Sequence, residues 1–306
     1  MSSPAAWGPR LQPPSPVGTA PAERFSYHRT LSGKSAAPGR LVATLVLSTV
    51  GLFVVTLAAL LVVVGAARVL GDGGFSVDLG NGVDAGEMLA LNLGLAALVP
   101  LSGAIVWGVW RTRPRWLSST RPGLRWRWLG ASAGVAAVVW APLLLLATAA
   151  AAVDRKGGIG TGVVAFVAVV LVTTPLQAAG EEYLFRGLVL QSLGAVRLPT
   201  WLCCATSGAL FATAHLQFAP PLFADRFVLG CVLAAIAART GGIEAGIAIH
   251  AVKNIAVLVP AGLLDRTDAA LDPTGVSWLP LVVDVVLLSI ATPWLLRLAR
   301  RRGDLA

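Results

Sequence analysis

Ionisable side chains interrupt the apolar second half of this chain. The stretch GEEYLFRG contains Glu181, Glu182 and Arg186 and follows about twenty mostly apolar residues. Positions i and i+4 of a helix share a face, so Glu182 and Arg186 are expected to form an ion pair. Glu181 lies about 100° around the helix and lacks that partner. A spare, desolvated carboxylate can act as a base or acid near neutral pH, although the three side chains could instead form an interfacial salt-bridge cluster.

Two further stretches place polar side chains on apolar segments. FATAH puts Phe211 and His215 on one helical face, and HAVKN does the same for His250 and Asn254. His250 and Asn254 can donate hydrogen bonds to a developing oxyanion. The alternatives are a core histidine bound to a backbone carbonyl at 215, and polar contacts between helices at 250 and 254. Only three histidines occur in the chain, and two of them lie here.

Together these residues provide a carboxylate, an imidazole and an imidazole–amide pair on three segments. Such a set suits the attack of water on an acyl carbon. It also suits a divalent metal such as zinc, because Glu181, His215 and His250 would leave a position for water. The chain lacks the HExxH helix of soluble zinc proteases. We favour direct activation of water by Glu181, because the sequence shows no carboxylate that would orient the histidines.

The composition indicates that these segments cross a membrane. The 306 residues are 56% hydrophobic and 13% charged, which leaves too little polar surface for a soluble domain. A transmembrane helix needs roughly 20 apolar residues. The sequence therefore predicts an all-α polytopic membrane protein of about eight helices around an intramembrane catalytic cavity. The expected spans are 41–67, 89–110, 129–153, 159–179, 201–215, 227–238, 243–264 and 278–296.

The net charge of +9 lies in loops and does not indicate a nucleic-acid partner. Arginines and lysines gather in residues 1–40, in the loop 111–127 and in the tail, whereas the loop 72–87 is acidic. Cytoplasmic loops carry the Lys/Arg excess, so eight spans place both termini in the cytoplasm. The first apolar run is too long for a cleavable signal peptide. Richness in Gly, Ala, Val and Arg suggests a GC-rich bacterial genome, and the expected location is the bacterial plasma membrane.

The chain divides into four parts. Residues 1–40 are rich in Pro, Ser, Ala and Gly and are expected to form a disordered cytoplasmic arm. Residues 41–158 form a three-helix membrane scaffold, 159–298 a catalytic core and 299–306 a basic cytoplasmic tail. The cysteines lie in apolar segments without a CxxC pair and are expected to be buried small side chains: Cys203, Cys204 and Cys231.

Straight helices would hold Glu181 and His215 near opposite membrane faces. Pro175 and nearby glycines allow a break, so we expect a bent fourth segment and a water-filled cavity open to the cytoplasm. Lys253 points away from the His250 face, and Asp284 is its obvious partner within the membrane. We expect a Lys253–Asp284 ion pair between the last two spans.

The three stretches EEYLFRG, FATAH and HAVKN, in this order, resemble the motifs of the CAAX-processing and bacteriocin-processing intramembrane protease family. The family pattern is EExxxR, FxxxH and HxxxN, and the resemblance covers about residues 159–264. It implies an all-helical fold of roughly eight spans with a cavity inside the membrane. The implied activity is endoproteolysis of membrane-associated proteins, including removal of the last three residues of prenylated CAAX proteins.

Carried onto this chain, the resemblance implies that Glu181 and His215 activate water. His250 and Asn254 would bind the oxyanion, and the site would be shaped by Glu182, Arg186 and Phe211. The family's chemistry is described both with and without a metal. The expected partners are the lipid bilayer and a membrane-associated protein or peptide substrate. A non-catalytic immunity or scaffold protein is the alternative, and a transporter is disfavoured because no inverted repeat is visible.

Overall fold

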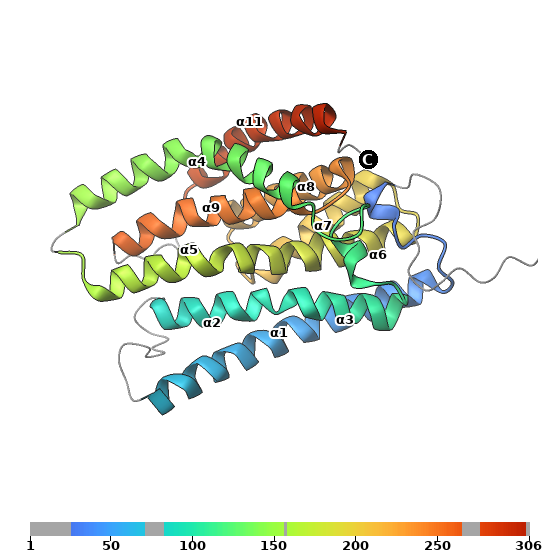
Figure 1. The fold of residues 1–306 in the computed structure, drawn as a ribbon, viewed down its shortest axis with the longest axis horizontal. Coiled ribbons are helices and arrows are strands. Elements are labelled where there is room, and N and C mark those ends of the chain that lie inside the picture. Colours follow the sequence, from blue (N-terminus) through green and yellow to red (C-terminus); the bar gives the residue numbers. More distant parts are fainter. Residues whose placement is uncertain (1–25, 71–82, 156–157, 265–275, 304–306) are drawn as a thin grey trace, which may run out of the picture.

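The computed structural model describes residues 26–70, 83–155, 158–264 and 276–303, and its regular elements there are helices (Figure 1). The long helices run side by side as a bundle. Their bounds are α1 (Ala37–Leu70), α2 (Ala85–Ala96), α3 (Leu98–Trp110), α4 (Trp126–Asp154), α5 (Thr161–Glu182), α6 (Leu190–Ala195), α7 (Thr200–Ala214), α8 (Pro220–Thr240), α9 (Glu244–Leu263) and α11 (Leu279–Arg302). Two 3₁₀ turns, η1 (Tyr27–Arg29) and η2 (Pro114–Leu117), and the π-helical segment η3 (Tyr183–Val189) complete the described elements.

Within the described residues, seven helical stretches are long and apolar enough to cross a membrane, and the chain is a polytopic membrane protein. The spans are Ala37–Val69, Ala85–Trp110, Trp126–Asp154, Thr161–Ala195, Pro220–Thr240, Glu244–Leu263 and Leu279–Arg302. The predicted fifth span corresponds to α7, which has 15 residues. At 1.5 Å per residue α7 is about 22 Å long and falls short of a bilayer core of about 30 Å. The expected eight spans are therefore seven full-length helices and one short one.

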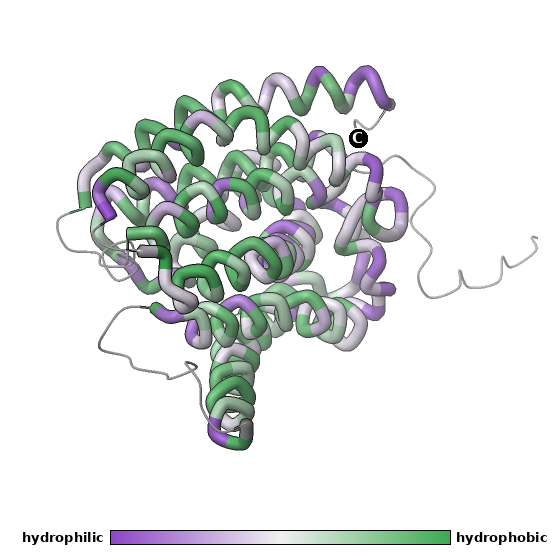
Figure 2. Tube along the Cα trace, turned by 60° about the vertical axis from the view of Figure 1, so that its left-hand side comes forward, coloured by the Kyte–Doolittle hydropathy of each residue, from purple (hydrophilic) through white to green (hydrophobic). Residues whose placement is uncertain are grey.

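The polar ends of the bundle are separated by apolar helix walls (Figure 2). The helix α1 begins and α11 ends at the same end of the bundle, on the right in Figure 1. The described termini thus lie on one side of the bundle, as the prediction of eight spans required. Which compartment that side faces stays a prediction from the positive-inside rule.

Part of the predicted disordered arm is folded. Tyr27 and His28 of η1 are buried, and the Tyr27 hydroxyl donates to the Leu117 carbonyl. Burial raises the pKa of Tyr27 well above its usual value, which keeps the hydroxyl protonated as a donor. The backbone of His28 also packs closely against Gly194 of α6. The prediction for residues 26–40 is therefore wrong, because one buried tyrosine anchors this segment; residues 1–25 lie outside the described part.

The fourth span does not break as expected. α5, η3 and α6 form one continuous stretch from Thr161 to Ala195, and the helix continues through Pro175. The distortion is instead the π-helical segment that starts directly after Glu182. Segments of this kind are rare and occur frequently at functional sites.

This continuation also explains how Glu181 and His215 come to similar depths. The stretch runs on to Ala195, so Glu181 lies about 21 Å from that end of the bundle. α7 starts at Thr200, at the same end, and reaches His215 after about 22 Å. The expectation that straight helices hold Glu181 and His215 near opposite membrane faces assumed that the fourth span ended near residue 179.

The helices around α5 and α9 form the centre of the bundle. α4 packs along α9, α2 packs along α5, and α5 packs along α9. α7 packs against α8, where Gly208 and Gly230 let the two backbones approach closely. The division into a scaffold (41–158) and a catalytic core (159–298) stays a prediction, although α2 and α4 each contact the core directly.

Candidate active site

Two adjacent carboxylates end α5 in the interior of the bundle. Glu181 is 6% exposed, and Glu182 and Arg186 are fully buried. Arg186 Nη1 donates to Glu182 Oε1 at 2.8 Å, so the predicted i,i+4 ion pair is confirmed. The Glu181 Oε2 atom is buried and has no hydrogen-bond partner among the described residues. Glu182 Oε2 likewise has none, but Glu182 is paired with Arg186 through Oε1. Glu181 has no arginine partner among the described residues, as its place on the helix indicated.

His250 of α9 lies between the two carboxylates. Its Nδ1 is 3.1 Å from Glu182 Oε1, and its Nε2 is 3.4 Å from Glu181 Oε2. A ring nitrogen facing a carboxylate has its tautomer and orientation fixed by that group. Glu182 therefore orients His250 as well as neutralising Arg186. The sequence interpretation assigned no such carboxylate to a histidine, and that part of it is wrong.

The ring of Phe211 on α7 packs against the rings of both His215 and His250. The ring centroid of Phe211 lies 4.7 Å from that of His215 and 5.6 Å from that of His250. The Arg186 guanidinium carbon lies 4.3 Å from the same centroid. His215 Nδ1 donates to the Phe211 carbonyl at 2.8 Å. Because a carbonyl only accepts, the neutral ring carries its proton on Nδ1 and a lone pair on Nε2.

Asn254 lies one turn beyond His250 and has its own partner on α5. Its Nδ2 donates to Gln177 Oε1 at 3.1 Å. Gln177 is four residues before Glu181, so the pairs Glu181–His250 and Gln177–Asn254 are successive contacts along the same two helices. The sequence analysis did not assign a role to Gln177. Its i−4 spacing from Glu181 was the signal that could have identified it.

Lys253 makes two ion pairs beside this site. Its Nζ lies 2.6 Å from Asp284 Oδ2 on α11 and 2.9 Å from Asp225 Oδ2 on α8. The predicted Lys253–Asp284 pair is confirmed. Asp225 was missed because the expected sixth span began at residue 227, whereas α8 begins at Pro220. This triad holds α8, α9 and α11 together around the site.

Glycines allow the close helix contacts that bring these groups together. A Cβ at Gly246 would come within 2.5 Å of Glu182 Oε2. Gly246 is one turn before His250 on the same face of α9. Gly246 leaves space for the Glu182 carboxylate, and His250 contacts it. A Cβ at Gly180 would overlap with the backbone carbonyl of Leu95 on α2. The position of the residue next to Glu181 is therefore fixed by backbone packing.

Replacing Gly180 by Ala is expected to destabilise the protein by about 1–3 kcal/mol, because the added methyl meets backbone and not a movable side chain. The measurement is the thermal unfolding midpoint of the purified protein in detergent. Gly134→Ala in α4 is the matched control, since a Cβ there meets nothing within 4 Å. Equal midpoints for the two variants would contradict the packing argument.

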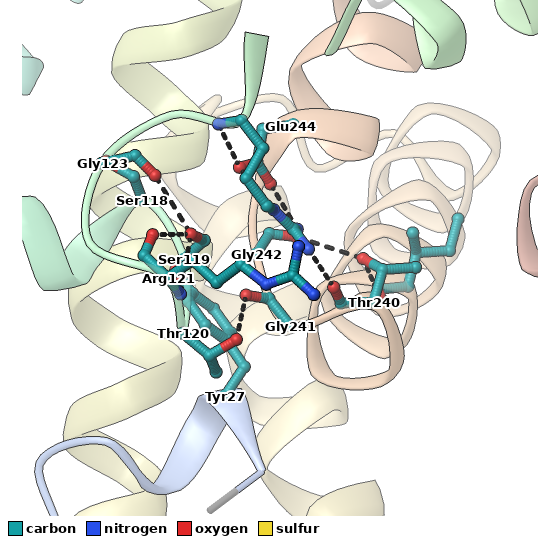
Figure 3. Close-up of polar contacts among 12 residues, drawn as sticks. Tyr27, Ser118, Ser119, Thr120, Arg121, Gly123, Thr240, Gly241, Gly242 and Glu244 are labelled. Carbon is teal, nitrogen blue, oxygen red and sulfur yellow. Dashed lines mark hydrogen bonds and ion pairs between the residues drawn. The ribbon is translucent and has the colours of Figure 1, made fainter. Parts of the chain in front are cut away.

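A second polar network fixes the start of α9 (Figure 3). Glu244 is fully buried and accepts hydrogen bonds from Arg125 Nε at 2.9 Å and Nη2 at 2.7 Å. Arg125 Nη1 also donates to the Thr240 carbonyl at 2.8 Å. An isolated antiparallel bridge joins Ser119 to Gly242. Since His250 follows Glu244 by less than two turns, this network sets the position of the histidine.

The side chains suggested as metal ligands face one another and the backbone. Both nitrogens of His250 lie against carboxylates, and His215 Nδ1 bonds a carbonyl. In the part of the chain that the structure describes, no group of three or more His, Cys, Asp or Glu side chains is arranged to hold a metal ion. The carbonyl bond of His215 leaves its Nε2 unused, and bonds to Nδ1 from a carboxylate or carbonyl also occur in metal-binding histidines. The suggested zinc site of Glu181, His215 and His250 therefore stays a prediction.

Comparison with known proteins assigns this region to a family. A family model described as "Type II CAAX prenyl endopeptidase Rce1-like" matches residues 162–256. The chain contains an Rce1-like domain. This Rce1-like domain includes α5, η3, α6, α7, α8 and most of α9, so it holds every site residue from Gln177 to Asn254. The resemblance in the three motifs is therefore confirmed.

The Rce1-like domain is about a third of the 306 residues, and α1–α4 and α11 lie outside it. Searches of curated proteins and of solved structures found no match. The family is one of endopeptidases, which implies a protein or peptide substrate, and the buried Glu–His contacts lie inside the matched segment.

Proposed function

We propose that this protein is an intramembrane endopeptidase that hydrolyses peptide bonds of membrane-associated proteins or peptides. One observation carries the proposal: the buried Oε2 of Glu181 has no hydrogen-bond partner among the described residues and lies 3.4 Å from His250 Nε2. Buried carboxylate oxygens are nearly always hydrogen-bonded, so an unpaired one needs a reason. Accepting a proton from a water molecule is that reason here.

The charges of the site suit proton transfer. Arg186 and Glu182 cancel each other. Glu181 and His250 are adjacent and can hold one further proton between them, as a neutral pair or as a carboxylate and an imidazolium. Both arrangements leave the buried cluster with zero net charge, which limits the cost of placing it in a low-dielectric interior.

In the ion-pair arrangement Glu181 is the base. A water oxygen attacks the carbonyl carbon of the scissile amide while Glu181 takes its proton, and the carbonyl π electrons move to oxygen. The tetrahedral intermediate then breaks its C–N bond, and Glu181 returns the proton to the leaving amine. His215 orients the water through the lone pair of Nε2, because its Nδ1 proton is committed to the Phe211 carbonyl.

His250 and Asn254 are the proposed oxyanion donors. The imidazolium of His250 presents an Nε2–H toward Glu181, where the reacting carbonyl would sit. Asn254 donates one amide hydrogen to Gln177 and carries a second N–H that would donate to the oxyanion. Glu182, Arg186 and Phe211 act through the others, by holding the imidazole and enclosing the site.

The test is a cleavage assay with the purified full-length chain in lipid vesicles. Lipid-anchored and single-span reporter peptides are incubated with wild type and Glu181→Ala, and fragments are identified by mass spectrometry. We expect fragments only with the wild type. Cleavage that survives the substitution would reject the mechanism, and no cleavage by either protein would favour a non-catalytic immunity or scaffold role. A parallel arm with a chelator tests whether a divalent metal such as zinc is needed.

A further inference from the structure

An apolar groove on the outside of the bundle lies close to the site but apart from it. The groove has a volume of about 440 Å³ and runs along one face of α3, past Pro100, Gly103, Ala104 and Trp107. Its lining is almost entirely apolar. Small residues at 103 and 104 leave the hollow, because larger side chains there would fill it. The hollow extends over about 11 Å of α3, from residue 100 to residue 107.

Tyr183, the first residue of η3 and the neighbour of Glu182, also lines the groove. The Tyr183 hydroxyl shares a hydrogen bond of 2.7 Å with Ser118 Oγ. The Ser118 carbonyl in turn accepts from Ile243 N at 3.0 Å, just before α9. A molecule in the groove would therefore touch the segment that carries the carboxylates.

One end of the groove is cationic. Arg115 of η2 lines it, and Arg111 and Arg113 are exposed nearby at the end of α3. Trp107 is 59% exposed and lies one turn before the end of α3 at Trp110, and tryptophans near the end of a span commonly mark the membrane interface. The groove therefore begins among apolar side chains of α3 and ends at Arg115.

We propose that this groove binds an anionic phospholipid, with an acyl chain along α3 and the headgroup phosphate at Arg115. The apolar length matches a chain segment, and the arginines match a negative headgroup at the membrane surface. A neutral lipid would fill the same hollow but would leave the cations without a partner. Charge complementarity therefore decides for the anionic lipid. The binding does not depend on peptidase activity.

The test is native mass spectrometry of the full-length protein after incubation in detergent with equal amounts of phosphatidylglycerol and phosphatidylcholine. We expect the wild type to retain phosphatidylglycerol preferentially. Arg115→Gln should reduce that preference about fivefold, the effect of one arginine near the surface. Ala104→Trp should reduce retention of both lipids, since it fills the groove. The same preference is expected in Glu181→Ala, which separates this result from the fate of the proposed function.

Two matched controls keep the test specific. Arg297→Gln removes an exposed arginine elsewhere at the same end of the bundle, and Val138→Trp adds a tryptophan to a 61% exposed position of α4. Both should retain lipid as the wild type does. Equal retention of the two lipids by the wild type would overturn the proposal, and so would equal losses in the variants and their controls. Phosphatidylglycerol should also raise the thermal midpoint of the wild type more than phosphatidylcholine does.

Discussion

Replacing Glu181 by Gln is expected to lower kcat by a factor of about 10²–10⁴, because the amide cannot take a proton from water. The substitution keeps the shape of the side chain. It also removes no hydrogen bond from Oε2, which has none among the described residues. The thermal midpoint should therefore stay close to that of the wild type. The measurement combines kcat and KM for a reporter peptide in vesicles with thermal unfolding in detergent.

Glu182→Gln is the informative comparison, because it makes the same isosteric substitution at the adjacent residue. Glu182 contacts Arg186 at 2.8 Å and His250 at 3.1 Å, so its loss should lower both activity and the midpoint. Glu181→Gln should lower activity alone. Equal loss of stability in the two variants would contradict the assignment of the base to Glu181 and of the structural role to Glu182. Glu181→Asp is expected to keep part of the activity. Its carboxylate can still accept a proton, but the shorter side chain places it farther from the water.

The sequence predicted those contacts that lie within one helix or follow from charge. The Glu182–Arg186 pair depends only on helical spacing, and it is present. The Lys253–Asp284 pair crosses two helices, and it was predictable because few ionisable residues lie within the spans. The motif resemblance likewise identified the segment that the family model matches.

Contacts that depend on which helix faces approach each other closely were not predictable. The place of His250 between both carboxylates requires α5 and α9 to approach at Gly246, and the sequence does not show which glycines face another helix. The depth of Glu181 depends on the continuation of the span through η3 to Ala195, although Gly187 and Gly194 suggested an interruption. Gln177 was overlooked because a neutral side chain carries no charge to mark it.

The ion pair that was predictable from spacing is also where the largest loss of stability is expected. Arg186→Met should destabilise the protein by about 3–5 kcal/mol, since it leaves Glu182 charged and buried without its cation. It also removes the guanidinium that lies over the Phe211 ring at 4.3 Å. The measurement is equilibrium unfolding by denaturant in mixed micelles, at fixed lipid content.

The double variant Glu182→Gln/Arg186→Met separates loss of the pair from loss of packing. If the cost of Arg186→Met is an uncompensated charge, neutralising Glu182 should recover part of it, and the double variant should be more stable than Arg186→Met alone. Coupling energies of contacting residues are about 0.5–3 kcal/mol, so the recovery should be measurable. Additive losses would instead show that Arg186 contributes through its contact with Phe211, and that Glu182 is held in place by His250.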